Sequence, residues 1–288
     1  MLWHNRTLIL TAAFVLTLSA GSVRPAFAAS PAPAQSTASS AEERRLAEAV
    51  DAIRHADYRG DRAELTRRAH QLEASTTPEL EKYREYWRGF AYWRRVINGF
   101  NETPLPDDLF ADLELATAAF RTALRLDPAF EDAKSALAGC LMSEMYLVSA
   151  KPSDLKTKVF AEGIAALKAL KESAQENPRS LWILGGNEMS APPPWGGDLA
   201  KAAAIYERGL AAARREATGA ARAPWIPSWG APESLMSLAW LHSHGAAIHR
   251  DLARAYALGA LAAVPDWHYV GDILLPAIEK LPAAASVP

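Results

Sequence analysis

The chain has 288 residues, more than one typical domain of roughly 100–200 residues, so two small domains or one elongated array would both fit. Half of the residues are hydrophobic, and 31 Lys and Arg nearly balance 33 Asp and Glu, which excludes a disordered polyelectrolyte. This balance also gives no reason to expect a nucleic-acid partner. The single cysteine, Cys140, excludes an intramolecular disulfide and a zinc site built on paired cysteines. Because much of the hydrophobic half is alanine, we expect thin, closely packed helices.

Residues 1–28 have the pattern of a secretory signal peptide. Arg6 lies in a short leading segment without acidic residues, an apolar run covers Thr7–Ala20, and the small residues Ala26 and Ala28 precede a cleavage site after Ala28. The run is shorter than the roughly 20 residues that span a bilayer, so a cleaved signal is favoured over an uncleaved anchor. No lipid-bearing cysteine follows, and no later segment reaches spanning length. We therefore expect an exported, periplasmic protein without stable membrane insertion.

The rest of the chain has a helical pattern. Residues 29–41 are poor in bulky side chains and predict a flexible linker. From Glu42 onward apolar positions recur at helical spacing, and no window alternates as a half-buried strand would. Pro and Gly interrupt the pattern often enough to predict about eleven helices, and short turns between them favour stacked antiparallel hairpins. We expect one all-α domain over residues 42–282 and a disordered tail over residues 283–288.

One spacing recurs within these helices: a small residue, a larger residue four positions later, a small residue three positions further on, and then Pro. The small residues would let one helix of a hairpin approach its neighbours, the larger residue would fill the gap, and Pro would end the helix. One copy has Arg214 in place of Pro. The copies are Ala116, Phe120, Ala123 and Pro128; Ala166, Leu170, Ser173 and Pro178; Ala202, Tyr206 and Gly209; and Ala253, Ala257, Ala260 and Pro265.

This spacing resembles the second helix of the tetratricopeptide repeat (TPR). The preceding helices match less well: Leu137-Ala138 and Leu238-Ala239 keep the family's large and small positions, but the copies lie further apart than its roughly 34 residues. The Gly-Gly-Asp turn at Gly196–Asp198 and the Leu-Leu-Pro ending at Leu274–Pro276 resemble a group of exported bacterial TPR-like proteins. The resemblance implies a right-handed α-solenoid and export, but no activity. The alternative is a helical bundle with accidental spacing.

The residues whose side chains could take part in catalysis or ligand binding fit structural roles better than functional ones. Asp198 follows two glycines and precedes a helix, so we expect its carboxylate to cap that helix rather than leave room for an anion. The histidines His242, His244 and His249 have no carboxylate at a metal-site spacing, so no metal is expected. Cys140 lies in an apolar run, which predicts a buried side chain. Because signatures of hydrolases, P-loops and dinucleotide sites are absent from the sequence, we expect neither catalysis nor a cofactor.

The segment Tyr83–Arg95 is dense in aromatic and arginine residues on both helical faces. Two interpretations stay open. It is either a central helix buried on two sides, or a groove wall that offers aromatic planes and guanidinium groups to a peptide, carboxylate or glycan. The first interpretation predicts that Trp87→Ala harms stability more than binding. The second has as candidate partner-binding residues Trp87, Arg94, Asn187, Glu188 and Trp195.

The expected function is binding. A curved stack of hairpins offers an extended concave face, so we expect an exported scaffold with a protein or peptide partner that becomes ordered on binding. An alternative is a solute-handling accessory of a transport system, similar to the periplasmic TPR components associated with TRAP transporters but without a lipid-anchor cysteine. A small cavity lined by aromatics and an arginine would favour this alternative, whereas an open groove would favour the scaffold. An enzyme without a recognisable motif is a third hypothesis.

Overall fold

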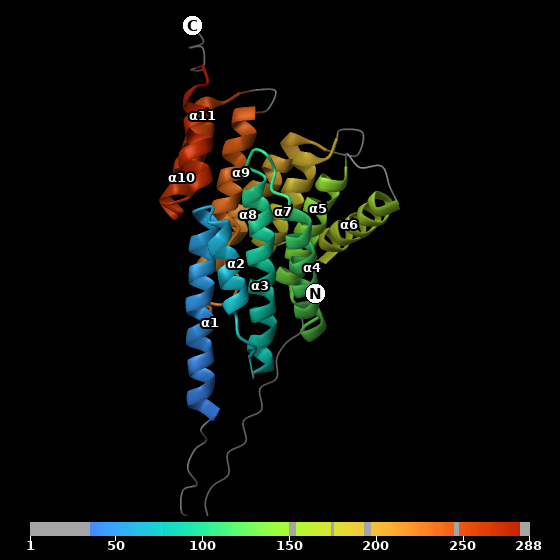
Figure 1. Ribbon diagram of the computed structural model, residues 1–288. Coiled ribbons are helices and arrows are strands. Elements are labelled where there is room, and N and C mark those ends of the chain that lie inside the picture. The colour runs from blue at the N-terminus through green and yellow to red at the C-terminus, as the bar shows by residue number, and fades with distance from the viewer. Residues whose placement is uncertain are drawn as a thin grey trace, which may run out of the picture.

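The computed structural model describes residues 35–75, 77–149, 154–173, 176–192, 197–244 and 248–282. Within these ranges the protein is entirely helical, as predicted, with eleven α-helices and one π-helical turn (Figure 1). None of these helices is both long enough and apolar enough to cross a membrane. The predicted signal peptide, its cleavage site at Ala28 and the predicted tail at residues 283–288 lie outside the described residues.

Consecutive helices pack pairwise as hairpins: α1 with α2, α3 with α4, α5 with α6, α7 with α8, and α9 with α10. The first helices of successive hairpins also touch, α3 with α5, α5 with α7, and α7 with α9, and form an inner layer. The helices are α1 Gln35–Tyr58, α2 Arg62–Gln71, α3 Pro78–Gly99, α4 Leu109–Leu126, α5 Glu131–Val148, α6 Asp154–Ser173, α7 Pro178–Ser190, α8 Leu199–Ala217, α9 Ala231–His244, α10 Arg250–Ala263 and α11 Leu275–Glu279, and the π-helical turn is η2 Tyr269–Leu274.

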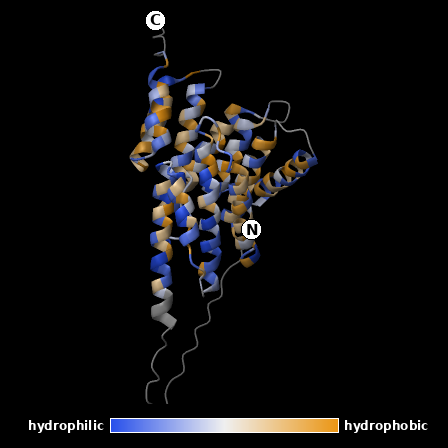
Figure 2. Ribbon diagram, in the orientation of Figure 1, coloured by the Kyte–Doolittle hydropathy of each residue, from blue (hydrophilic) through white to orange (hydrophobic). Residues whose placement is uncertain are grey.

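Both hydrophobic and hydrophilic residues occur along most helices (Figure 2). This mixture suits helices that bury one side against a neighbour. The first helix is longer than the sequence predicted. It begins at Gln35, inside the segment 29–41 predicted as a flexible linker. Ala, Gln and Ser are all compatible with a helix that continues from Glu42, and the nearest prolines lie before Gln35. Low bulk alone therefore did not distinguish a linker from the start of this helix.

Helix starts follow from capping chemistry. Asp198 caps α8 as predicted, because its carboxylate accepts hydrogen bonds from the backbone N–H groups of Ala200 and Lys201 at 2.9 and 3.1 Å. Asn177 accepts two N–H hydrogen bonds from the first turn of α7 in the same way. Pro178 is the first residue of α7, where its missing N–H costs nothing. The sequence predicted that this proline ends the preceding helix, and the structure shows that it also begins the next one.

The repeated small and large positions join the two helices of a hairpin. Phe120 of α4 is fully buried, and a Cβ added to Gly89 of α3 would lie 3.0 Å from its ring. Tyr206 of α8 is buried in the same way, and a Cβ added to Gly185 of α7 would lie 2.5 Å from its ring. A glycine on the first helix thus makes room for the large residue on the second. The other buried positions of the signature are Ala116, Ala123, Leu170, Ala202, Gly209, Ala253, Ala257 and Ala260.

The helix α6 departs from this pattern. Ser173, predicted to face a neighbour, is exposed, and Ala166 is only partly buried. The close approach to α5 occurs at Gly163, which contacts Met145, and the buried side of α6 consists of Val159, Gly163, Leu167 and Leu170. The predicted copy at Ala166, Leu170 and Ser173 is therefore out of frame. The alanine-rich sequence of α6 offers small residues in several registers, and its helix leans away from the stack in Figure 1.

Residues far apart in the sequence close the fold. Tyr58, the last residue of α1, packs edge-on against Trp267 near the C-terminus, with ring centroids 5.0 Å apart. Its hydroxyl donates a hydrogen bond to Glu233 of α9 at 2.8 Å. The connector between α8 and α9 also returns to the inner layer, where Trp229 lies against Trp93 of α3. The end of the first helix therefore contacts the C-terminal part of the fold directly.

Candidate functional site

The aromatic helix α3 lies at the centre of the core. Trp87 and Arg94 are 1% and 3% exposed, so neither side chain lines an open surface. The Nε1–H of Trp87 donates a hydrogen bond to the Trp225 carbonyl at 2.7 Å. Burial on both faces of α3 supports the interpretation of Tyr83–Arg95 as a central helix rather than as a groove wall.

Arg94 belongs to a buried polar network between α1, α3 and α9. Its Nε donates to Asp57 at 2.7 Å, and Asn98 donates to the same carboxylate at 3.1 Å. Burial raises the pKa of Asp57, and the charge of Arg94 opposes that rise. Nearby, Glu233 accepts from Tyr58 and from the Gly230 N–H at 2.8 and 2.7 Å. These hydrogen bonds tie three helices together, although the Nη1 of Arg94 is buried without a hydrogen-bond partner in the described structure.

The other predicted partner-binding residues lie elsewhere. Asn187 and Glu188 are partly buried near the end of α7. The Glu188 carboxylate accepts a hydrogen bond from Lys171 of α6 at 3.2 Å, and its carbonyl accepts the Asp198 N–H at 2.9 Å. Trp195 lies outside the described residues. The structure therefore does not bring the predicted set together: two members are in the core and two support the α7–α8 turn.

The histidines at the end of α9 pack against aromatic rings. His242 stacks on Tyr256 and His244 on Trp240, with centroids 5.6 and 4.5 Å apart. Burial and the neighbouring His249 lower the pKa of His242. Among the described residues, no group of three or more His, Cys, Asp or Glu side chains could hold a metal ion.

A second charged cluster joins α2, α3 and α4. Asp108 pairs with both Arg62 and Arg95, and Asp112 also pairs with Arg95. Burial raises the pKa of Asp112 to about 6, although the charge of Arg95 opposes the shift. Cys140 is fully buried, as predicted, and burial raises the pKa of its thiol well above the ordinary range. The charges of the cluster pair with one another, and the thiol is buried.

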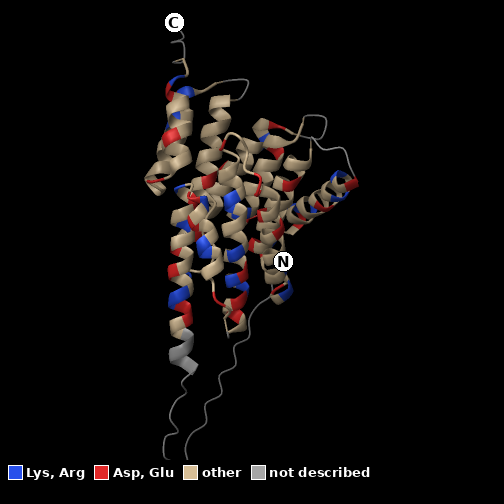
Figure 3. Cartoon of the chain, viewed as in Figure 1, with Lys and Arg blue, Asp and Glu red and all other residues tan. Residues whose placement is uncertain are grey.

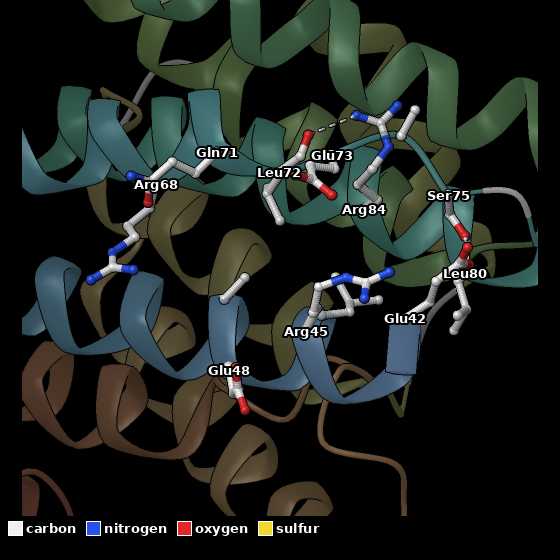
Figure 4. Close-up of a pocket in the computed structure, with 13 residues that line it drawn as sticks. Glu42, Arg45, Glu48, Arg68, Gln71, Leu72, Glu73, Ser75, Leu80 and Arg84 are labelled. Atoms are coloured by element: carbon white, nitrogen blue, oxygen red, sulfur yellow. Dashed lines mark hydrogen bonds between the residues drawn. The ribbon is translucent and has the colours of Figure 1, made fainter. Parts of the chain in front are cut away.

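A cleft opens between α1, α2 and the start of α3, and it has a volume of about 270 Å³ (Figure 4). Its floor is apolar, formed by the buried side chains of Leu46, Leu72 and Leu80. Charged residues of both signs surround the floor. An apolar pocket with a polar rim is the usual form of a binding site. Sequence reasoning missed this cleft because its residues come from three helices and none of them is unusual by itself.

The arginines of the cleft differ in whether they are free to bind a ligand. Arg84 is held by Glu81 and Glu85 and reaches toward the Leu72 carbonyl (Figure 4). Arg68 is paired with Glu64 at 2.6 Å. Arg45 is exposed on α1 and has no hydrogen-bond or ion-pair partner within the described residues. It is therefore the cation best placed to meet a ligand.

The fold and this cleft define an all-α protein of stacked helical hairpins with a small amphipathic surface pocket. Comparisons with known protein families, with curated proteins and with solved structures find no match. Membership of the TPR family therefore stays a prediction from the sequence.

Proposed function

We propose that the protein is an exported TPR-like scaffold that binds a protein or peptide segment rather than catalysing a reaction. The observation that carries this proposal is the cleft between α1, α2 and α3, which combines an apolar floor with a charged rim (Figure 4). Export is supported by the signal-peptide pattern of residues 1–28.

The cleft indicates the chemistry of its ligand. Its volume of about 270 Å³ suits one large apolar side chain of a peptide, placed on the floor of Leu46, Leu72 and Leu80. A carboxylate next to that side chain would meet Arg45 at the rim. Lys and Arg lie among Asp and Glu along α1 to α3 (Figure 3), so binding would depend on local pairing rather than on a field of one sign.

The solute-handling alternative has less support. It needs a small cavity lined by aromatic side chains and an arginine. The aromatic side chains of α3 instead pack against one another and against Trp229, and Arg94 is paired with Asp57. The amphipathic cleft has no aromatic residue in its lining.

The test is a selection of displayed peptides on the mature chain, followed by calorimetric titration of the selected sequences. Arg45→Glu reverses the available cation at the rim, and Ala49→Leu fills the cleft from α1. We expect each change to weaken binding at least tenfold. Arg44→Glu is the matched control, since Arg44 is also exposed on α1 but does not line the cleft. Equal affinity for wild type, Arg45→Glu and Ala49→Leu, or failure to select any peptide, would count against the proposal.

A further inference from the structure

The connector between α8 and α9 lies on the inner layer of helices. Its residues 222–230, the inner segment, include Trp229, which is only 1% exposed. The indole N–H of Trp229 donates a hydrogen bond to the Tyr86 hydroxyl at 2.7 Å. Its ring centroid lies 5.6 to 5.9 Å from those of three aromatic residues of α3 and α7, namely Phe90, Trp93 and Trp182. Trp229 thus occupies an aromatic site between two helices of the array.

The inner segment is held mainly by side chains. In the described structure, its hydrogen bonds to α3 are those from Trp229 to Tyr86 and from Trp87 to the Trp225 carbonyl. Its one internal backbone hydrogen bond joins Ile226 to Ala223. The segment contains one turn, at Pro224 and Trp225, and it is anchored by an aromatic side chain and a few hydrogen bonds, much as a bound peptide would be.

The side of the inner segment that faces α1 is poorly packed. A half-open cavity of about 210 Å³ lies between the two and is lined by Val50 and Arg54 of α1 and by Ala223 and Ile226 of the segment. The Arg54 Nε is buried without a hydrogen-bond partner, although buried polar groups are normally paired. The segment therefore fits α3 closely but leaves α1 incompletely covered.

Two arginines and one carboxylate line the cavity, and one of the arginines is already paired. Arg54 and Arg222 both line it, whereas Asp51 is its only carboxylate. Arg222 forms an ion pair with Glu216, so Arg54 is the lining arginine for which the described structure gives no ion pair. A ligand with a carboxylate would therefore complement this space better than the inner segment does.

We propose that the inner segment is an intramolecular ligand, and that its site accepts a partner segment with a tryptophan anchor and a carboxylate that reaches Arg54. The proposal deepens the binding function and rests on it, but the site is separate from the cleft of Figure 4. Because the tethered segment competes at an effective concentration on the order of millimolar, it would suppress binding of the partner to the wild-type protein. The segment thus sets both the specificity and the affinity of the site.

The test uses a fluorescent peptide with the sequence of residues 222–230, added to the mature chain. We expect Trp229→Ala, which vacates the aromatic site, to bind this peptide at least tenfold more tightly than the wild type. A peptide in which alanine replaces the residue equivalent to Trp229 should not bind. A peptide with aspartate in place of Ala223 should bind more tightly still, and Arg54→Gln in the protein should remove that gain.

The matched control is Trp267→Ala, which removes another buried tryptophan but leaves the inner segment in place. It should not create peptide binding. Hydrogen exchange of the wild type gives an independent readout: the amides of Trp225, Ile226, Ser228 and Trp229 should exchange through local opening, faster than those of α3. A folded Trp229→Ala variant that ignores the peptide would overturn the proposal. Exchange of the inner segment only through global unfolding would do the same, even if Trp229→Ala fails to fold.

Discussion

Arg94 of α3 donates a hydrogen bond from Nε to Asp57 of α1 at 2.7 Å, in an ion pair whose side chains are 3% and 1% exposed. The same carboxylate accepts from Asn98, and Glu233 lies close enough to raise its pKa further. A buried ion pair is not by itself strong evidence of stability, because desolvation offsets much of the attraction. Breaking one is costly, since the remaining charge is left without a partner. The pair therefore holds α1 in one position against α3.

We predict that Asp57→Asn and Arg94→Met each lower the free energy of unfolding by about 3–5 kcal/mol, because each leaves an unpaired buried group. The double variant should cost clearly less than the sum of the two. Urea denaturation of the four proteins measures this coupling. The control is the surface pair Arg121 and Glu162, joined at 2.6 Å but about half exposed, whose removal should cost less than about 1 kcal/mol. Strict additivity at the buried pair would contradict the prediction.

Neighbouring glycines in α7 should respond in opposite ways to alanine. A Cβ at Gly185 would lie 2.5 Å from the Tyr206 ring, so Gly185→Ala forces α7 and α8 apart and should cost about 1–3 kcal/mol. At Gly186 the nearest atom is the flexible end of Met142, 3.3 Å away. Gly186→Ala should therefore be neutral or stabilising by up to about 1 kcal/mol through helix propensity. Thermal unfolding followed by circular dichroism compares the two, and equal shifts would argue against the close approach at Gly185.

Trp87 is a third test of the core. Because Trp87 is almost fully buried and donates to the Trp225 carbonyl, Trp87→Ala should lower the free energy of unfolding by about 3–5 kcal/mol. Ile164→Ala is the control, since this large side chain on α6 is 58% exposed, and its loss should change stability by no more than about 0.5 kcal/mol. Denaturant titration of both variants checks the contrast. A small effect of Trp87→Ala would favour the groove-wall interpretation of α3.

The raised pKa of Asp112 predicts a pH dependence of stability. With a folded pKa of about 6 and an ordinary value near 3.8, the folded state binds the proton more strongly than the unfolded state. The contribution of Asp112 is thus fully present below about pH 4 and is lost as the pH rises through about 6. Relative to Asp112→Asn, the wild type should become more stable as the pH is lowered from 7 to 5. Urea unfolding at several pH values measures the difference.

Asp108, in the same cluster, provides the control of opposite sign. Burial acts to raise the pKa of Asp108, but hydrogen bonds and charges of Arg62 and Arg95 lower it overall. Its contribution is present above the ordinary value and is lost as the pH falls through the lowered one. Because the charge of Asp108 helps to raise the pKa of Asp112, Asp108→Asn should weaken the wild-type slope between pH 5 and 7 but not reverse it. Parallel profiles for wild type and Asp112→Asn would disprove the assignment of that slope to Asp112.

The sequence predicted the local features of the candidate site but not the contacts between distant residues. The pattern of Tyr83–Arg95 was compatible with a buried helix or with a groove wall, because a helix with large residues on both faces can serve either purpose. Burial of Trp87 and Arg94 supports the first. No sequence pattern predicts the cleft at Arg45 or the cavity at Arg54, because their residues come from separate segments of the chain.

What the sequence by itself determined was local: the all-α class, the number of helices, their hairpin order, the Asp198 cap and the small positions in α4 and α8. These features depend on residues a few positions apart, so periodicity and capping chemistry reveal them. Only the tertiary structure decided which small residue of α6 faces its neighbour and what covers the inner layer. The hydrogen bonds from Trp87 to Trp225 and from Trp229 to Tyr86 span 138 and 143 positions. Contacts at such separation depend on how every intervening hairpin stacks, and no local pattern encodes them.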